Sequence, residues 1–436
     1  MSIGVLFLFF AILLAISLPV SATLTISAFL PNFAEFFSTG DFSAMIDRMA
    51  VLVRNLFNGV DVFTLLAIPM FILAGGIMAK GGISEKLFNV FAYFLANKTA
   101  GMPIAVILST LFYSMTSGSG PATVAAVGSM AIPLLVKLGY DLKWSTALIA
   151  VTGGVGVISP PSIPYVLFGS ATGTSIGDLF IAGIIPALFI ILLLILYAFF
   201  HCKRHGEDKE KLLEYHKEVR AKGFWAVFKD SFLAILAPII ILGSIYGGIA
   251  SPTEAAVIAV LYSLVLSVFI YRTLRFKQLR EVFVNAANTY STLLFVLAGA
   301  VAFGRTLTLL RAPQQVADIV LGTFASYIAI LLVINLFMLF IGTFLDTTPA
   351  ILIMAPLFLP IAVAMGMHPV HFGVMMVINK AIGFVTPPLG VNIFVSSSLT
   401  GLPMMTIIKH SMVPLIAFLI ALLVIAFVPW FTLVLI

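Results

Sequence analysis

The sequence is poor in charge and has almost no cysteine. Of its 436 residues only 9% are charged, against about 25% in soluble domains. The one cysteine, Cys202, excludes an internal disulfide framework and a thiolate metal cluster. The sequence also shows no nucleophile–base motif, no glycine-rich phosphate loop and no clustered metal ligands. These absences argue against an enzyme, and no cofactor is expected.

Apolar residues are abundant and make up 61% of the chain. They form repeated runs of about 20 residues, the length that a helix needs to cross a bilayer. The predicted fold class is an all-α polytopic membrane protein with about ten transmembrane helices. Residues 1–30 contain no Lys or Arg, so they lack the basic start of a signal peptide and are interpreted as a retained first span.

Two short motifs interrupt the apolar runs in the same way. Residues 156–161 and 383–388 each contain a glycine, two further residues, a hydroxyl residue and two prolines. Adjacent prolines prevent a continuous helix. Within a bilayer, broken backbone is tolerated only where it is buried or lines a polar cavity. Paired breaks in two halves of a chain indicate the binding site of a transporter.

The two motifs belong to a long internal repeat. Downstream of position 130 the matching positions lie 227 residues apart, as with Pro133 and Pro360. Upstream the separation is 228, as with Pro121 and Pro349, which places a one-residue difference at the predicted hairpin tips. Each half is expected to cross the membrane an odd number of times, so the second half is inverted relative to the first.

The predicted organisation is two inverted repeats, 1–202 and 231–436, joined by a charged cytoplasmic linker, 203–230. An elevator-type arrangement has a mobile transport domain on a fixed scaffold. The scaffold is expected at 1–58, 176–202, 231–285 and 403–436, and the transport elements at 59–172 and 286–399. Within the scaffold, 41–58 and 274–285 are expected to lie along the membrane interface. Within the transport elements, 84–97 and 314–324 are too short to cross the membrane.

The distribution of basic residues predicts the orientation. With the linker in the cytoplasm, 17 Lys and Arg residues fall inside and four fall outside. This asymmetry follows the positive-inside rule. It places both termini in the periplasm of a bacterial inner membrane. Such a pattern suits membrane loops rather than nucleic-acid binding, so no nucleic-acid partner is expected.

Each half also contains a predicted re-entrant hairpin, with tips at 117–123 and 342–349. Helix ends at a tip and at a break expose carbonyls that coordinate a hard cation, and N-terminal ends that favour anions. Na⁺ is the expected coupling ion, because no intramembrane chain of Asp, Glu and His offers a proton relay. The alternative is that the tips are only tight bends. The expected Na⁺ ligands are Ser117, Ser119, Gly156, Ser159, Asp346, Thr347, Gly383 and Thr386. Ser119 is expected to approach Ser159, and Asp346 to approach Thr386.

Asp346, Arg305 and Lys380 are the ionisable residues expected at membrane depth. Each costs about 3 kcal/mol or more there unless it is paired, which makes it a functional candidate. Lys380 and Arg305 are expected to bind a substrate anion, with snorkelling or a structural ion pair as the alternative. The full set of expected substrate-binding residues is Lys380, Arg305, Pro160, Pro387 and Asn392.

At these motifs the chain resembles the large membrane subunit (M subunit) of tripartite ATP-independent periplasmic (TRAP) transporters, within the ion transporter superfamily. The matching stretches are 117–126, 158–162, 251–256, 345–350 and 382–392. The resemblance implies Na⁺-coupled uptake of an organic acid by an elevator mechanism. It also implies two partners, a small four-helix membrane subunit (Q-type) and a periplasmic substrate-binding protein. Lys380 stands where the family pattern has an apolar residue. The alternatives are a self-sufficient Na⁺/dicarboxylate symporter of related architecture, an ion channel and a structural membrane component.

Overall fold

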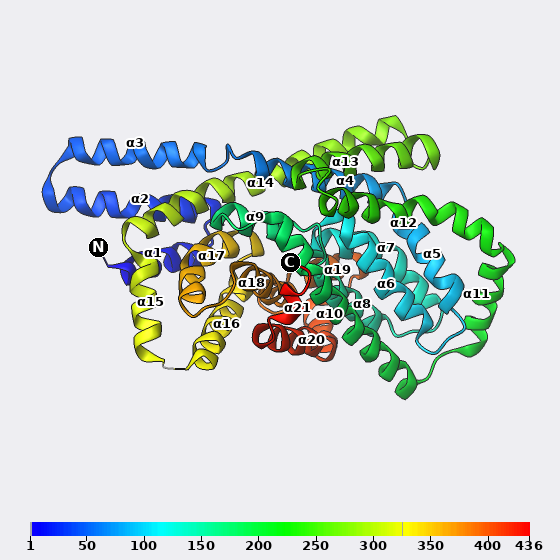
Figure 1. Cartoon of the computed structure of the whole chain (residues 1–436). Coiled ribbons are helices and arrows are strands. Elements are labelled where there is room, and N and C mark those ends of the chain that lie inside the picture. The colour runs from blue at the N-terminus through cyan, green and yellow to red at the C-terminus, as the bar shows by residue number, and fades with distance from the viewer. Residues whose placement is uncertain (1, 325) are drawn as a thin grey trace.

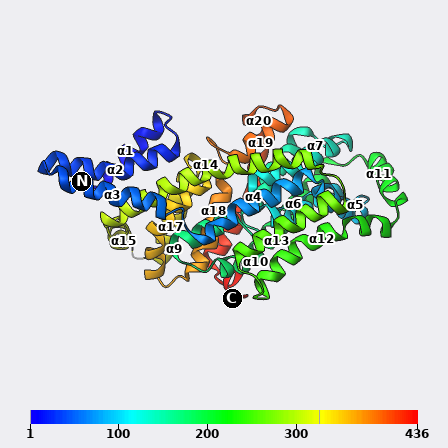
Figure 2. The same cartoon turned by 90° about the horizontal axis from the view of Figure 1, so that it is seen from above.

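The computed structural model describes residues 2–324 and 326–436, and all regular secondary structure in these ranges is helical. Nine of the described helical segments are long and apolar enough to cross a membrane. They are 63–80, 120–137, 176–205, 224–246, 252–270, 276–309, 327–344, 347–364 and 404–427. The all-α polytopic prediction is confirmed, as expected for a bilayer, where a helix satisfies its own backbone hydrogen bonds. The molecule is elongated, with α1–α3 at one end and α11 at the other (Figures 1 and 2).

The N-terminal end consists of α1 (Ile3–Ala15), α2 (Val20–Thr39) and α3 (Phe42–Asn58). Figure 1 shows α2 and α3 as an antiparallel pair that projects from the rest of the molecule. The Asp41 side chain caps α3 by accepting a hydrogen bond from the backbone N–H of Ala44. An ion pair between Arg48 and Glu35 joins the two helices. The segment expected at 41–58 is therefore helical and largely exposed, and its place along the membrane interface stays a prediction.

Helix α14 (Phe276–Leu309) is a single helix of 34 residues and corrects one expectation. Residues 274–285 were expected to form an interfacial segment separate from a span at 287–307. The helix continues because no proline interrupts it and 285–288 contains no strong helix breaker. The expected boundary between scaffold and transport elements, at 285/286, therefore falls inside one helix. Helix α14 packs on α2, where the Thr306 hydroxyl donates to the Ala28 carbonyl at 3.0 Å.

Helix α4 (Ala67–Lys80), entered through the 3-10 turn η1 (Phe63–Leu66), packs on α14. Helix α12 (Phe224–Tyr246) packs on α13 (Pro252–Leu264), which continues as a π-helical turn, η3 (Val265–Ile270). Helix α13 packs on α4 and starts with a capping box between Ser251 and Glu254. Helices α5 (Ile83–Leu95) and α15 (Ala312–Thr323) are short, as the sequence predicts.

The remaining helices form two matching sets. The hairpins are α6 (Gly101–Ser117) with α7 (Gly120–Lys137) and α16 (Tyr327–Phe344) with α17 (Thr347–Ala364). The broken helices are α8 (Leu142–Thr152), η2 (Gly153–Val157) and α9 (Ile163–Thr172) in the first half, and α18 (Pro369–Gly383) and α19 (Val391–Thr400) in the second. Then follow α10 (Ile176–His205) in the first half, and α20 (Met404–Phe427) and α21 (Trp430–Leu433) in the second.

The helix starts locate the one-residue difference between the halves. Helices α7 and α17 start 227 residues apart, and so do α8 and α18, whereas α9 and α19 start 228 apart. The second break is therefore one residue longer than the first. The two hairpin tips are equally long, so the one-residue difference expected there is not seen. Gly390, which precedes α19, takes the left-handed conformation at φ 48°, which glycine adopts without the strain that a Cβ brings.

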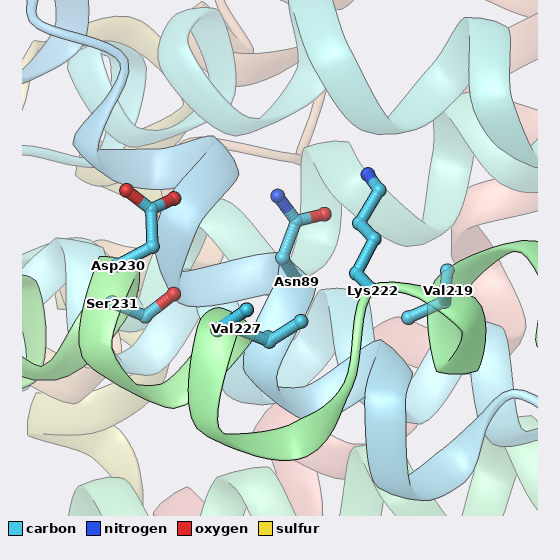
Figure 3. A pocket seen from close by; sticks show the side chains of 7 residues that line it. Asn89, Val219, Lys222, Val227, Asp230 and Ser231 are labelled. Carbon is cyan, nitrogen blue, oxygen red and sulfur yellow. The ribbon is translucent and has the colours of Figure 1, made fainter.

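The linker contains its own helix, α11 (Lys209–Ala221), and is attached to the bundle at both ends. At its start the Glu207 carboxylate accepts hydrogen bonds from the Tyr140 hydroxyl at 2.5 Å and from the backbone N–H of Ala100. Burial and this hydrogen bond raise the pKa of Tyr140 above its usual value. At its end, α5, α11 and α12 enclose a pocket of about 400 Å³, where the side chains of Asn89, Lys222 and Asp230 project on the same side (Figure 3).

Candidate substrate and cation site

The first break is buried throughout. Every residue from 144 to 169 is shielded from solvent, including Pro160 and Pro161. Hairpin one lies directly against it, because the backbone N–H of Ile163 donates to the Gly118 carbonyl at 3.2 Å. Both proline pairs, 160–161 and 387–388, are joined by cis peptide bonds. The tip of hairpin one and the first break therefore form one packed unit.

Hydroxyl groups fill the space between this tip and the break. Ser114 Oγ and Ser159 Oγ lie 2.6 Å apart, and Ser117 Oγ lies 2.9 Å from Thr123 Oγ1. Thr123 in turn donates to the Ser119 carbonyl at 2.7 Å. We call Ser114, Ser117, Ser119, Thr123 and Ser159 the hydroxyl cluster. Its oxygens are neutral and all lie at the end of a helix or beside a break, the kind of ligand set that suits Na⁺.

The partner of Ser159 differs from the expected one. Ser159 pairs with Ser114, one turn before the tip, whereas Ser119 approaches the break through its backbone. A Cβ built on Gly156 would lie 2.8 Å from the Ser119 carbonyl oxygen, too close for any side chain. Sequence reasoning missed Ser114 and Thr123. Ser114 lies on α6 and Thr123 on α7, so no single helical periodicity in the sequence links both of them to Ser117.

The second break is more open. Its attachment is similar, since the backbone N–H of Leu389 donates to the Thr343 carbonyl at 3.2 Å. A Cβ on Gly383 would lie 2.6 Å from the Gly342 carbonyl oxygen, so hairpin two also packs tightly on its broken helix. Pro387 is half-buried, while Pro388 and Leu389 are exposed.

The expected ligands of the second half are not drawn into a hydroxyl cluster. Thr386 donates to the carbonyl of Ile382 in its own helix at 2.7 Å. Asp346 precedes α17 without a side-chain cap and is half-buried, and Thr347 is buried in the first turn of α17. Among the described residues no hydrogen bond joins Asp346 to Thr386, so their expected approach is not seen as a direct contact.

Asn392 connects the two halves. It is fully buried at the start of α19, and its side-chain Nδ2 donates to the Ala150 carbonyl of α8 at 3.0 Å. A Cβ on Gly120 would lie 3.2 Å from Asn392 Oδ1, so the amide also reaches hairpin one. Asn392 Oδ1 is buried and accepts no hydrogen bond from any residue that the structure describes. The amide therefore lies between both halves, with one acceptor free.

Lys380 and Arg305 occupy very different positions. Lys380 is only 1% exposed, and its ammonium donates to the Met338 carbonyl of α16 at 2.5 Å. No carboxylate of a described residue lies within ion-pair distance of it. Arg305 is exposed on α14 and makes no ion pair or hydrogen bond within the described ranges. A shared anion site for the two is therefore not seen, and the substrate-binding role of each stays a prediction.

A cavity of about 420 Å³ lies where hairpin one meets α4 and α14. Its polar lining residues are Lys80, Ser117, Ser119, Ser129, Asn285 and Thr289. Lys80 forms an ion pair with Glu281 of α14 at 2.5 Å. The volume suits a small organic molecule. Sequence reasoning did not single out Asn285 and Thr289, because 274–285 was assigned to the interface and the continuity of α14 was not foreseen.

Comparison with known proteins agrees with this arrangement. Residues 7–431 match the family model described as "Tripartite ATP-independent periplasmic transporter, DctM component". The chain is also similar in fold to the YdaH transporter of Alcanivorax borkumensis, whose crystal structure was described as having an unusual topology. The TM-score is 0.59 at 14% identity, and the match covers 89% of each chain.

Several curated relatives are similar in sequence. The isethionate TRAP transporter permease protein DctMQ of Oleidesulfovibrio alaskensis is 39% identical over 97% of this chain, but the chain spans only 64% of that relative's length. The C4-dicarboxylate TRAP transporter large permease protein DctM of Pseudomonas aeruginosa is 36% identical over 88% of each chain. The sialic acid TRAP transporter large permease protein SiaM of Vibrio cholerae is 35% identical over 88% of each. Given the match over nearly its whole length, the chain is a multi-pass membrane protein that belongs to the DctM-component family of TRAP transporters.

Proposed function

We propose that the chain is the permease subunit of a Na⁺-coupled, binding-protein-dependent transporter that imports an organic acid by an elevator mechanism. The observation that carries the proposal is the matched attachment of both hairpins. In each half a backbone N–H after the proline pair donates to a carbonyl of the hairpin, Gly118 in one and Thr343 in the other. Paired broken helices with hairpins against them are typical of carriers whose binding site lies at the membrane midplane.

Na⁺ coupling is supported by the chemistry of the hydroxyl cluster. A dehydrated Na⁺ needs several oxygens at once, and the cluster supplies side-chain and carbonyl oxygens within a buried volume. Its described members are neutral, so they offer no group for a proton relay. The predicted ligands of the first site are Ser117, Ser119, Gly156 and Ser159, to which the geometry adds Ser114. Asp346, Thr347, Gly383 and Thr386 remain the predicted ligands of the second half.

An organic anion is the proposed substrate class. The relatives are named for isethionate, C4-dicarboxylates and sialic acid. The 420 Å³ cavity is large enough for such a molecule, and Lys80 and the start of α7 give its wall positive character. Hairpin one and α4 belong to the expected transport elements, whereas Val282 and Asn285 at the start of α14 belong to the expected scaffold, so the cavity borders both parts.

The proposed partners are a small Q-type membrane subunit of four helices and a periplasmic substrate-binding protein. The name DctMQ of one relative, of which this chain spans 64%, is compatible with a second subunit beyond the region of similarity. The proposed location is the bacterial inner membrane. Both termini lie in the periplasm in this proposal, since the linker and its basic residues then lie in the cytoplasm.

The test is uptake into liposomes that contain this chain together with its small subunit. A labelled organic acid bound to the binding protein is supplied outside, under a Na⁺ gradient or under a proton gradient alone. The expected result is uptake only with Na⁺ and only with the binding protein. Full uptake on protons alone contradicts Na⁺ coupling, and uptake without the binding protein favours the self-sufficient symporter.

A further inference from the structure

Lys380 is a buried cation beside the second break. The matching position beside the first break is Gly153, which carries no charge. It lies in the last turn of α18, directly before the second break, and is only 1% exposed. A lysine buried at membrane depth without a carboxylate partner is costly, so its position needs a compensating role. Snorkelling does not provide one, because the ammonium does not reach the surface.

The ammonium is directed at hairpin two. It donates to the Met338 carbonyl at 2.5 Å and lies 3.5 Å from the position that a Cβ on Gly342 would occupy. One turn further along α18, Gly383 makes the closest approach to the same hairpin, at the Gly342 carbonyl. The ammonium therefore sits beside the junction of hairpin and broken helix, where the first half has its hydroxyl cluster.

A polar seam holds Lys380 in this place. Asn379 donates to the backbone carbonyl of Asn335 at 2.9 Å, and Asn335 donates to the Leu331 carbonyl at 2.9 Å. The seam fixes α18 against α16 on the side away from the tip. The neighbouring residue, Lys380, extends along the same face of α16 toward Met338 and Gly342.

We infer that the Lys380 ammonium is a built-in cation that takes the place of a coupling ion in the second half. This inference rests on the proposed Na⁺ coupling and limits the Na⁺ site to the first half of the chain. Na⁺ then binds at the hydroxyl cluster of the first half, while the second half is already supplied with positive charge. An ammonium and a Na⁺ ion both accept electron density from carbonyl oxygens, so one can stand in for the other at a carbonyl-lined junction.

The first experiment replaces the tethered ammonium by a free one. Lys380→Ala is purified in detergent with N-methylglucamine as background cation, and its thermal unfolding midpoint is measured with and without methylammonium chloride. The midpoint of the variant is expected to fall by several degrees and to be restored at least in part by methylammonium. Wild type and Lys409→Ala, whose lysine is exposed, are the matched controls and should not respond. No response of Lys380→Ala to methylammonium overturns the inference.

The second measurement counts Na⁺ sites. Titration of the unfolding midpoint with Na⁺ should fit one class of site in wild type, which Ser159→Ala removes. Lys380→Ala should gain a further Na⁺ response that survives the addition of Ser159→Ala. A wild-type protein with two Na⁺ responses, one of them insensitive to Ser159→Ala, overturns the inference.

Variants of lysine itself cover the case in which Lys380→Ala yields no folded protein. Lys380→Arg keeps the charge and should be more stable than Lys380→Gln, and the opposite order contradicts a role for the charge. These readouts do not depend on transport. If wild-type uptake proves independent of Na⁺ while methylammonium still restores Lys380→Ala, the proposed coupling fails and the cation site stands.

Discussion

The two broken helices share a sequence pattern but have different surroundings. In the first half, burial is continuous from residue 144 to residue 169, whereas in the second it ends at 385 and leaves Pro388 and Leu389 exposed. The first break meets its hairpin through a hydroxyl cluster, and the second through a glycine contact and an ammonium. Inverted halves thus share backbone geometry while differing in chemistry.

The largest effect is expected where the halves are most alike, at Gly156 and Gly383. An added Cβ would lie 2.8 Å or less from a hairpin carbonyl oxygen in both cases. Gly156→Ala and Gly383→Ala should each cost about 1–3 kcal/mol by overpacking and reduce uptake by about 100-fold. Thermal unfolding and liposome uptake measure the two effects. Gly304→Ala in α14, where nothing lies within 4 Å, is the control and should leave both unchanged. Normal uptake by either variant would show that its hairpin does not need close contact.

The next effect distinguishes the hydroxyls of the two breaks. Ser159 is fully buried and pairs with Ser114 across the hairpin contact, whereas Thr386 donates within its own helix. Ser159→Ala is expected to weaken the apparent Na⁺ affinity of uptake by about tenfold or more, because loss of a buried oxygen ligand costs about 1–3 kcal/mol. Thr386→Val should change it by less than about threefold. Equal effects in both variants would mean that the halves bind Na⁺ alike.

Asn392 tests whether the halves move as one unit. Asn392→Ala removes its hydrogen bond to Ala150 and leaves that buried carbonyl unsatisfied. A loss of about 1–3 kcal/mol in unfolding free energy is expected. Uptake should fall by roughly tenfold, the equivalent of 1.4 kcal/mol. Asn379→Ala, within the second half alone, should destabilise the protein to a similar extent with less effect on uptake. If Asn379→Ala reduced uptake more than Asn392→Ala, the contact that couples movement of the two halves would not be at Asn392.

The smallest effect is expected at the rim of the cavity. Lys80 and Glu281 are partly exposed, with 36% and 60% of their side chains accessible, so their ion pair contributes only about 0–1 kcal/mol to stability. Lys80→Gln should leave the unfolding midpoint nearly unchanged and raise the KM for the anionic substrate about threefold. The shift should shrink at high ionic strength. A change in the maximal rate alone would place Lys80 outside the substrate path.

Sequence patterns predicted the elements of the fold well, for physical reasons that are local. Proline pairs and apolar runs act over a few residues, so the breaks, hairpins and short helices α5 and α15 are found where they were expected. The continuity of α14 was not foreseen, because a cluster of charged residues at its start imitates an interfacial segment even when the helix simply continues. The one-residue difference expected at the hairpin tips is not seen, and the longer second break was not foreseen, because matching residue types do not reveal which backbone positions are equivalent.

The location of the candidate site was predictable from the sequence, but the contacts between its side chains were not. Gly156, Ser159 and Asn392 lie at the contact of hairpin and break, as their motifs suggest. Ser114 and the cavity residues Asn285 and Thr289 depend on the rotation and packing of helices far apart in sequence, which no local pattern encodes. The direction of the Lys380 side chain likewise follows from the seam between α16 and α18 rather than from its own sequence neighbours.

The length of α14 has a consequence for how the surrounding lipid acts on the protein. At 1.5 Å per residue its 34 residues extend about 50 Å, well beyond the roughly 30 Å of a bilayer's hydrocarbon core. A rigid rod of this length must tilt, and its tilt depends on membrane thickness. Asn285 and Thr289 of α14 line the cavity, and Thr306 anchors the same helix to α2. We therefore expect a change in bilayer thickness to alter the tilt of α14 and, with it, the width of the cavity. We therefore expect the uptake rate in liposomes to vary with the chain length of the lipid.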